Sequence, residues 1–185
     1  MTIIDRSKKY FQKMIDDFGS DPYQLREHVL EAEKWASFML NKYPEADRDV
    51  VMLSVWLHDS GYYPIQKEID HAITGEQKAR EFLTKENFAE EKAEKVLHCV
   101  RAHRCRDVIP ESLEDKIIAF VDSASHMTHP MYIYIAMAKI EYKAIDKLER
   151  DYRDLSFFPD IKKELTPLYE SWKNLLKVYE KINLN

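Results

Sequence analysis

Two adjacent residues with chemically useful side chains, His58 and Asp59, follow the most apolar stretch of the chain, residues 50–57. A run this apolar predicts a helix that is buried on most of its sides. Gly61 and Pro64 follow closely and disfavour continuation of that helix, so the pair is expected at its C-terminal end. Because a buried ion pair that loses one partner costs about 3–5 kcal/mol, the Asp59 carboxylate is expected to meet a cation or another polar group there.

Two further residues of ligand-forming type, His28 and Asp122, are expected to point toward the same interior. At about 100° per residue, His28 falls within the apolar stripe of a helix predicted over residues 22–43. Asp122 follows the apolar residues 117–121. Each of these residues, like His58 and Asp59, therefore sits on an inward-facing helix position or at an inward-facing helix end.

The position of Asp122 on its helix leaves a question open. Periodicity places Asp122 beside Ile118 and Ser125, and not at the centre of the apolar stripe of this helix. A helix that is buried on two sides would carry Asp122 into the interior, whereas a surface helix would not. Asp115 and Asp107 are the alternative carboxylates, although both are more typical of a helix cap or a loop.

The order of these residues and their helical surroundings resemble the HD superfamily of metal-dependent phosphohydrolases, over about residues 21–125. A His-Asp dipeptide recurs by chance, but the ordered set in its helical setting is more specific. The resemblance implies that His28, His58, Asp59 and Asp122 hold one divalent cation, with Asp59 bridging to a second. Imidazole and carboxylate ligands suit Mn, Fe, Mg, Zn or Ni ions. Such a cation lowers the pKa of a bound water and polarises a phosphoryl oxygen.

Members of the superfamily with two metals carry further histidines between the His-Asp pair and the last aspartate, and here the candidates are His71, His98 and His103. On one regular helix, residues five apart diverge by about 140°, so His98 and His103 cannot both face one site. His103 lies with Val96 and Val100 on the inner face and His98 lies opposite. The sequence therefore favours His71 and His103 over His98 as ligands of a second metal or of a phosphate.

Other polar and aromatic residues near these positions have two interpretations each. Arg104 lies next to His103 and is the arginine of this loop that we expect to hold a phosphate, although a solvated loop residue is nearly as plausible. Tyr62 and Tyr63 could wall a substrate ring or belong to the core. His126 could support Asp122 from one turn away or be an ordinary histidine at a helix end.

The rest of the sequence predicts an all-α fold, an HD-domain-like helical bundle with a C-terminal helical extension. The chain holds only three glycines and no sustained period-two alternation, which favours helices throughout. We expect residues 1–130 to form the metal-binding helical domain and residues 131–185 to pack on it as one compact unit or to make an oligomer contact. Helices are expected over residues 5–18, 22–43, 50–57, 88–101, 131–152 and 160–182, from about residue 70, after Ser112, and with a break near Pro167.

Composition excludes several classes of function. The chain of 185 residues carries a net charge of −5, which gives no electrostatic basis for nucleic-acid or membrane-surface binding. No apolar run approaches the length of a membrane span and no signal peptide is recognised, so no membrane role is expected. Two cysteines do not make a disulfide framework, and the cytoplasm is the expected compartment.

The predicted function is hydrolysis of a phosphoester or phosphoanhydride of a small molecule or nucleotide by metal-activated water. Asp59 and His58 are the expected catalytic residues, with Asp59 orienting or deprotonating the water. The chain lacks a glutamate in the first turns after this pair, which weakens a nucleotidase assignment. The alternatives are a non-catalytic metal- or nucleotide-binding regulatory protein and, less favoured, a di-iron oxygenase on the same fold. The C-terminal helices would suit a homodimer.

Overall fold

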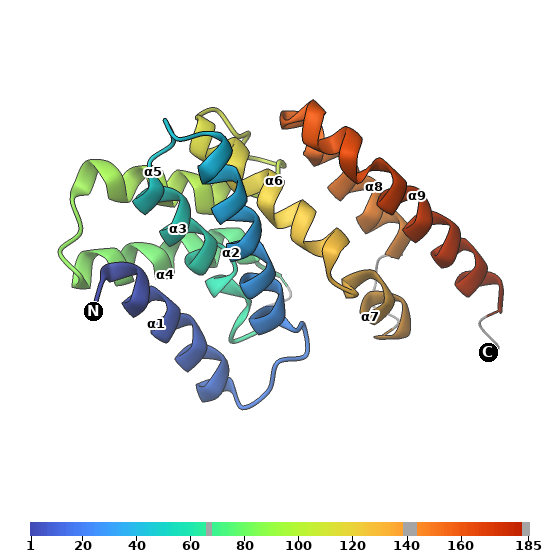
Figure 1. Cartoon of the computed structure of the whole chain (residues 1–185). Coiled ribbons are helices and arrows are strands. Elements are labelled where there is room, and N and C mark those ends of the chain that lie inside the picture. The colour runs from blue at the N-terminus through green and yellow to red at the C-terminus, as the bar shows by residue number, and fades with distance from the viewer. Residues whose placement is uncertain (66–67, 139–143, 183–185) are drawn as a thin grey trace.

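Every regular element in the described part of the chain is a helix (Figure 1), as predicted for an all-α fold. The computed structural model describes residues 1–65, 68–138 and 144–182. In chain order the elements are α1 Ile3–Phe18, α2 Leu25–Lys42, α3 Arg48–Leu57, η1 Ser60–Tyr62, α4 His71–Lys85, α5 Glu90–Ala102, α6 Leu113–Thr128, α7 Met131–Ala138, α8 Ala144–Asp154, η2 Leu155–Phe157 and α9 Pro159–Ile182.

Helix α6 is the central element of the fold. In Figure 1 it lies between the group formed by α2 to α5 and the pair α8 and α9, and it packs against both. Its buried residues include side chains on either side of the apolar stripe, among them Ser123, Ser125 and His126. The sequence predicts that Asp122 lies in the interior if its helix is buried on two sides, and α6 is buried in this way.

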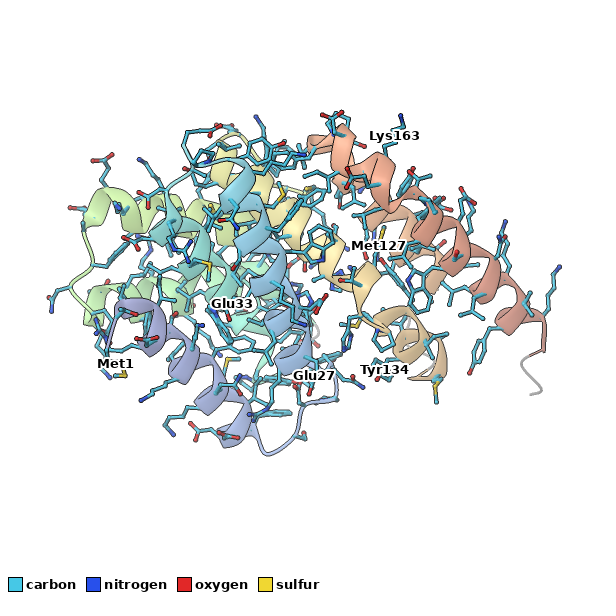
Figure 2. All side chains as sticks on the ribbon, in the orientation of Figure 1. Met1, Glu27, Glu33, Met127, Tyr134 and Lys163 are labelled. Carbon is cyan, nitrogen blue, oxygen red and sulfur yellow. The ribbon has the colours of Figure 1, made fainter. Side chains whose placement is uncertain are left out.

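The C-terminal helices share the core of the preceding part of the chain. The rings of Phe120 on α6 and Phe158 before α9 pack with centroids 5.3 Å apart. The indole nitrogen of Trp172 on α9 donates a hydrogen bond of 2.8 Å to the carbonyl of Met127, a residue labelled at the end of α6 in Figure 2. Leu148 on α8 belongs to the same buried cluster. Helices α7, α8 and α9 therefore cover the side of α6 that faces away from α3.

Helix α2 begins three residues later than predicted. Gln24 has a φ of 54°, a left-handed conformation that a helix interior does not accept, so α2 starts at Leu25. Asp21 nevertheless serves the helix start, because its carboxylate accepts hydrogen bonds from the backbone N–H groups of Leu25 at 2.9 Å and Arg26 at 3.0 Å.

The C-terminal helices also differ from the prediction. Within the helix predicted over residues 131–152, the structure has α7 and α8, and residues 139–143 between them lie outside the described residues. The break predicted near Pro167 is wrong, because α9 continues through it. Pro167 and Lys163 are exposed, so the backbone carbonyl that loses its intrahelical partner there can be hydrated.

Among the described residues, no helix has the length and apolar character that crossing a membrane requires.

Candidate metal centre

Four side chains from α2, α6 and the end of α3 converge on one point of the interior. The Nε2 atom of His28 lies 3.1 Å from Nε2 of His58, 3.3 Å from Oδ2 of Asp59 and 3.2 Å from Oδ1 of Asp122. The Nε2 atom of His58 lies 3.3 Å from the same Asp59 oxygen and 3.6 Å from the same Asp122 oxygen. Ligand atoms that share one ion at about 2.1 Å are separated by roughly 3.0–3.4 Å at neighbouring positions. His28, His58 and Asp59 form one group of ligand atoms that could hold a divalent cation, and Asp122 forms an adjoining group with His28 and His126.

A second cluster lies on the other side of Asp59. Its Oδ1 atom lies 3.4 Å from Nε2 of His71 and 3.8 Å from Nε2 of His103. The two imidazole nitrogens are 3.3 Å apart. The two oxygens of Asp59 thus face different histidine pairs, which is the arrangement of a carboxylate that bridges two ions.

Hydrogen bonds to backbone carbonyls determine which nitrogens of two histidines face the clusters. Nδ1 of His58 lies 2.8 Å from the carbonyl of Val55, and Nδ1 of His103 lies 2.6 Å from the carbonyl of Val100. A carbonyl oxygen can only accept, so each Nδ1 carries a proton and donates it. In the neutral ring the lone pair is then on Nε2, directed at the cluster, as a metal-ligating histidine requires.

Ser125 gives His28 the same orientation. The Ser125 hydroxyl donates to the backbone carbonyl of Asp122 at 2.7 Å, and its oxygen lies 3.1 Å from Nδ1 of His28. With the hydroxyl proton used in this way, Ser125 accepts from Nδ1–H of His28, and the lone pair of Nε2 faces that of His58. Lone pairs that face each other repel, whereas a cation between the two nitrogens would accept both of them as metal–ligand bonds. The sequence did not identify Ser125.

The electrostatics of the clusters also fit a cation. Burial acts to raise the pKa of Asp59, but the positive charge of His58 and hydrogen bonds from the neighbouring histidines hold it well below its usual range. Burial acts to lower the pKa of His28 and His58, but the carboxylates of Asp59 and Asp122 raise both. Burial, followed by the charge of His58, lowers the pKa of His103 to about 3, so this ring is neutral. A divalent ion supplies the positive charge that protons otherwise provide.

Two glycines let α4 approach the His58-Asp59 turn closely enough for His71 to reach Asp59. A β-carbon at Gly61 would lie 1.9 Å from the backbone oxygen of His71, and one at Gly75 would lie 3.0 Å from that of His58. The absence of a side chain at position 75 therefore permits this close backbone approach. Tyr62 stacks on the His71 ring at a centroid distance of 4.0 Å and fixes its plane.

The remaining candidates lie away from both clusters. His98 is on the opposite face of α5 from His103, with a side chain 41% exposed, and its Nδ1 contacts Oδ2 of Asp115 at 2.9 Å. Asp107 pairs with Arg101. Neither His98 nor the alternative carboxylates line the cavity that holds the two clusters.

His126 extends the first cluster toward the C-terminal helices. Its ring stacks on that of His28 with a centroid distance of 4.5 Å and an interplanar angle of 8°, and its Nε2 lies 3.6 Å from Oδ1 of Asp122. Its Nδ1 lies 2.9 Å from Nζ of Lys147 and 3.2 Å from Oδ2 of Asp151, both on α8. The sequence reading missed Lys147 and Asp151, since a Lys-Asp pair four residues apart is typical of a solvated helix face.

Both clusters open into one cavity of about 460 Å³ between α2, α4, α6, α7 and α8. Tyr23 and Tyr62 line it, as does Tyr134, which Figure 2 labels at α7. Among the described residues, five cationic side chains line it, in contrast to the net charge of −5 of the whole chain. They are Arg104, Arg106, Lys147, Arg150 and Arg153.

In a comparison with protein-family models, the HD domain model matches residues 25–127. This segment covers more than half of the chain and includes His28, the His58-Asp59 pair and Asp122. It ends in α6, so α7, α8 and α9 lie beyond it. A search of curated proteins and a search of solved structures each found no match. With its all-α fold and its ordered His, His-Asp and Asp residues, the chain belongs to the HD domain family.

Proposed function

We propose that the chain is a hydrolase that cleaves a phosphoester or phosphoanhydride of a small molecule or nucleotide in a metal-dependent reaction. The observation that carries this proposal is the position of Asp59, whose Oδ2 faces His28 and His58 while its Oδ1 faces His71 and His103. HD domains generally belong to metal-dependent phosphohydrolases, which agrees with this chemistry.

In this proposal the histidine and aspartate side chains hold the ions and position the reactants. His28, His58, Asp59 and Asp122 hold one divalent ion, and Asp59, His71 and His103 hold a second. The bound ions supply a water of lowered pKa and polarise the phosphoryl oxygen. Asp59 orients or deprotonates the attacking water. His58 helps to position that carboxylate, because a hydrogen bond from its Nδ1 to the Val55 carbonyl fixes the orientation of its ring.

The cationic residues of the cavity support an anionic substrate. Arg104 hydrogen-bonds to Asp70, and Arg106 lies 3.7 Å from the same carboxylate, so two guanidinium groups are balanced there by one negative charge. Asp70 also caps α4, directly before His71. We propose that Arg104 holds a substrate phosphate beside the second cluster, because its planar fork of N–H donors matches phosphate oxygens.

The direct test is phosphate release from a panel of an aryl phosphate, nucleoside mono-, di- and triphosphates and sugar phosphates, with Mn²⁺, Fe²⁺, Mg²⁺, Zn²⁺ or Ni²⁺ added to metal-depleted protein. We expect at least one substrate to be turned over only when metal is present. Metal binding without turnover of any substrate would instead support a regulatory protein that binds a metal or nucleotide.

Metal removal is expected to lower the stability of the fold. A ligand present at about 100 times its Kd stabilises the native state by about 2.7 kcal/mol. For a chain of this size, that corresponds to a Tm shift of about 5–10 °C. Differential scanning calorimetry before and after chelation measures the shift. A Tm that chelation leaves unchanged would contradict binding at the buried clusters.

Replacing His71 and His98 separately distinguishes the second cluster from its surroundings. His71→Ala is expected to reduce the bound metal from two ions to one per chain, because it removes one of three ligand groups of the second position. His98→Ala is the matched control, since this histidine contacts Asp115 and is remote from the cavity. Elemental analysis of the two variants measures the difference, and equal metal loss in both would rule out the assignment.

A two-ion centre that includes His71 and His103 would also suit a di-iron oxygenase. The approach of both histidines to Asp59 keeps this second candidate open. The arginine and lysine residues of the cavity favour the phosphate substrate. Iron content together with oxygen consumption separates the two candidates, since a phosphohydrolase releases phosphate without consuming oxygen.

A further inference from the structure

We propose that α8, which lies beyond the matched HD domain, forms an anion-binding wall of the same cavity. In this inference Lys147, with Arg150 and Arg153, holds a second anionic group of the substrate next to the phosphate at the metal centre. The preferred ligands are then molecules with two neighbouring phosphates, or a phosphate beside another anionic group, and not simple monoesters. The inference rests on the proposed function for the location of the first phosphate.

The imidazole ring of His126 separates Lys147 from the first metal position. Nζ of Lys147 is 2.9 Å from Nδ1 of His126, and Nε2 on the other side of that ring is 3.6 Å from Oδ1 of Asp122. The side chain is 17% exposed and lines the cavity. An anion bound at the metal centre therefore has this ammonium group as a neighbour along the cavity wall.

Asp151 holds the Lys147 ammonium in place. It is 3% exposed, accepts a hydrogen bond of 2.7 Å from Lys147 and accepts another of 2.9 Å from the hydroxyl of Tyr132 on α7. A solvated Lys-Asp pair contributes little and holds neither side chain in one geometry. The Lys147–Asp151 pair is largely buried, so the loss of hydration of both charges reduces its contribution to stability. The pair nevertheless fixes the position of a positively charged group at the cavity.

Cationic side chains outnumber carboxylates among the described α8 residues that line the cavity. These are Lys147, Arg150 and Arg153, with the carboxylates of Asp151 and Asp154. Burial raises the pKa of Asp154 to about 6 although the charge and hydrogen bond of Arg153 act to lower it, so this carboxylate is protonated more readily than a solvated aspartate. The wall is therefore suited to a further anionic group.

A second cationic wall, formed by Arg104 and Arg106, lies near the α8 wall, since the charge of Arg150 adds to burial and to the charge of Arg104 in lowering the pKa of Arg106. Arg104 and Arg106 share the Asp70 carboxylate, which lies 3.8 Å from Nδ1 of His71. The α8 wall adjoins the first cluster through His126, and the arginine wall adjoins the second cluster through Asp70. We infer that a chain of two or three phosphates contacts Lys147 beside the first cluster and Arg104 beside the second, so the preferred ligands carry several anionic groups.

The test compares the binding of inorganic phosphate and methylenediphosphonate to the Mn²⁺-loaded full chain by isothermal titration calorimetry. The diphosphonate resists hydrolysis, so its binding does not depend on turnover. We expect Lys147→Gln to weaken diphosphonate binding by about 10–100-fold, as expected for the loss of a charge-assisted contact, and to change phosphate binding by less than about threefold. Metal content should stay at the wild-type level.

Arg150→Gln provides a second variant in case Lys147→Gln unfolds, and the same selective loss is expected for it. Lys177→Gln is the matched control, since this exposed lysine on α9 does not line the cavity. Equal weakening of both ligands, or no weakening in either wall variant at wild-type metal content, overturns the inference. Selective diphosphonate binding without any phosphate release would support the α8 anion site and contradict the proposed hydrolase. Phosphate release that does not depend on Lys147 and Arg150 would support the hydrolase and contradict the α8 anion site.

Discussion

Asp59→Ala is expected to remove both metal positions and to lower phosphate release by at least about 10³-fold, while the helical fold persists. The reason is that the two side-chain oxygens of Asp59 face the two clusters separately, one 3.3 Å from Nε2 of His28 and the other 3.4 Å from Nε2 of His71. Alanine removes a ligand from both positions at once. Elemental analysis, phosphate release and far-UV circular dichroism measure the three parts of this result.

Asp115→Ala is the control for Asp59→Ala. Asp115 is also a buried carboxylate in contact with a histidine, at 2% exposure, but it caps α6 and lies outside the cavity. Its replacement should cost about 0.5–2 kcal/mol of stability through the lost cap and leave the metal content unchanged. An Asp59→Ala protein that keeps two ions or wild-type turnover would show that the bridging role is wrong.

Gly61→Ala is expected to destabilise the fold and to remove the second metal ion selectively. A β-carbon at this position would lie 1.9 Å from the backbone oxygen of His71 and 2.5 Å from the backbone nitrogen of Gly75. Backbone atoms cannot rotate away as a side chain can, so the start of α4 must move and take His71 with it. Overpacking of this kind typically costs about 1–3 kcal/mol. Denaturant unfolding and metal stoichiometry measure the two effects.

Gly19→Ala is the control that distinguishes a loss of stability from a displacement of His71. Gly19 ends α1 with a φ of 82°, and a β-carbon there would contact nothing within 4 Å. Alanine in this left-handed conformation costs about 1–2 kcal/mol through backbone strain alone. We expect this variant to bind two ions. If Gly19→Ala and Gly61→Ala lost metal to the same extent, metal loss would follow from instability and not from displacement of His71.

The residues of the first cluster could be identified from the sequence because helical periodicity and residue type point the same way. His28 lies within an apolar stripe, and His58 and Asp59 end a helix that is apolar throughout. Asp122 was ambiguous, since its inward position depends on α6 being buried on two sides, and that depends on α8 and α9. Helical geometry also separated His103 from His98, which lie about 140° apart on one helix.

The α8 residues could not be identified from the sequence. Lys147 and Asp151 form a pair four residues apart on a charged amphipathic helix, a pattern that predicts a solvated surface. Their burial results from packing against α6 and α7, which no local pattern records. The start of α2 was missed for a similar reason, because the left-handed conformation of Gln24 has no clear signal in its residue type.

The most direct test of the central claim is phosphate release by the metal-depleted protein before and after metal is restored, with the bound ions counted by elemental analysis. The two-cluster centre predicts no release without metal, and recovery of release as the bound metal approaches two ions per chain. Release that persists in excess chelator, or full metal occupancy with no release from any substrate of the panel, would contradict the assignment as a metal-dependent phosphohydrolase.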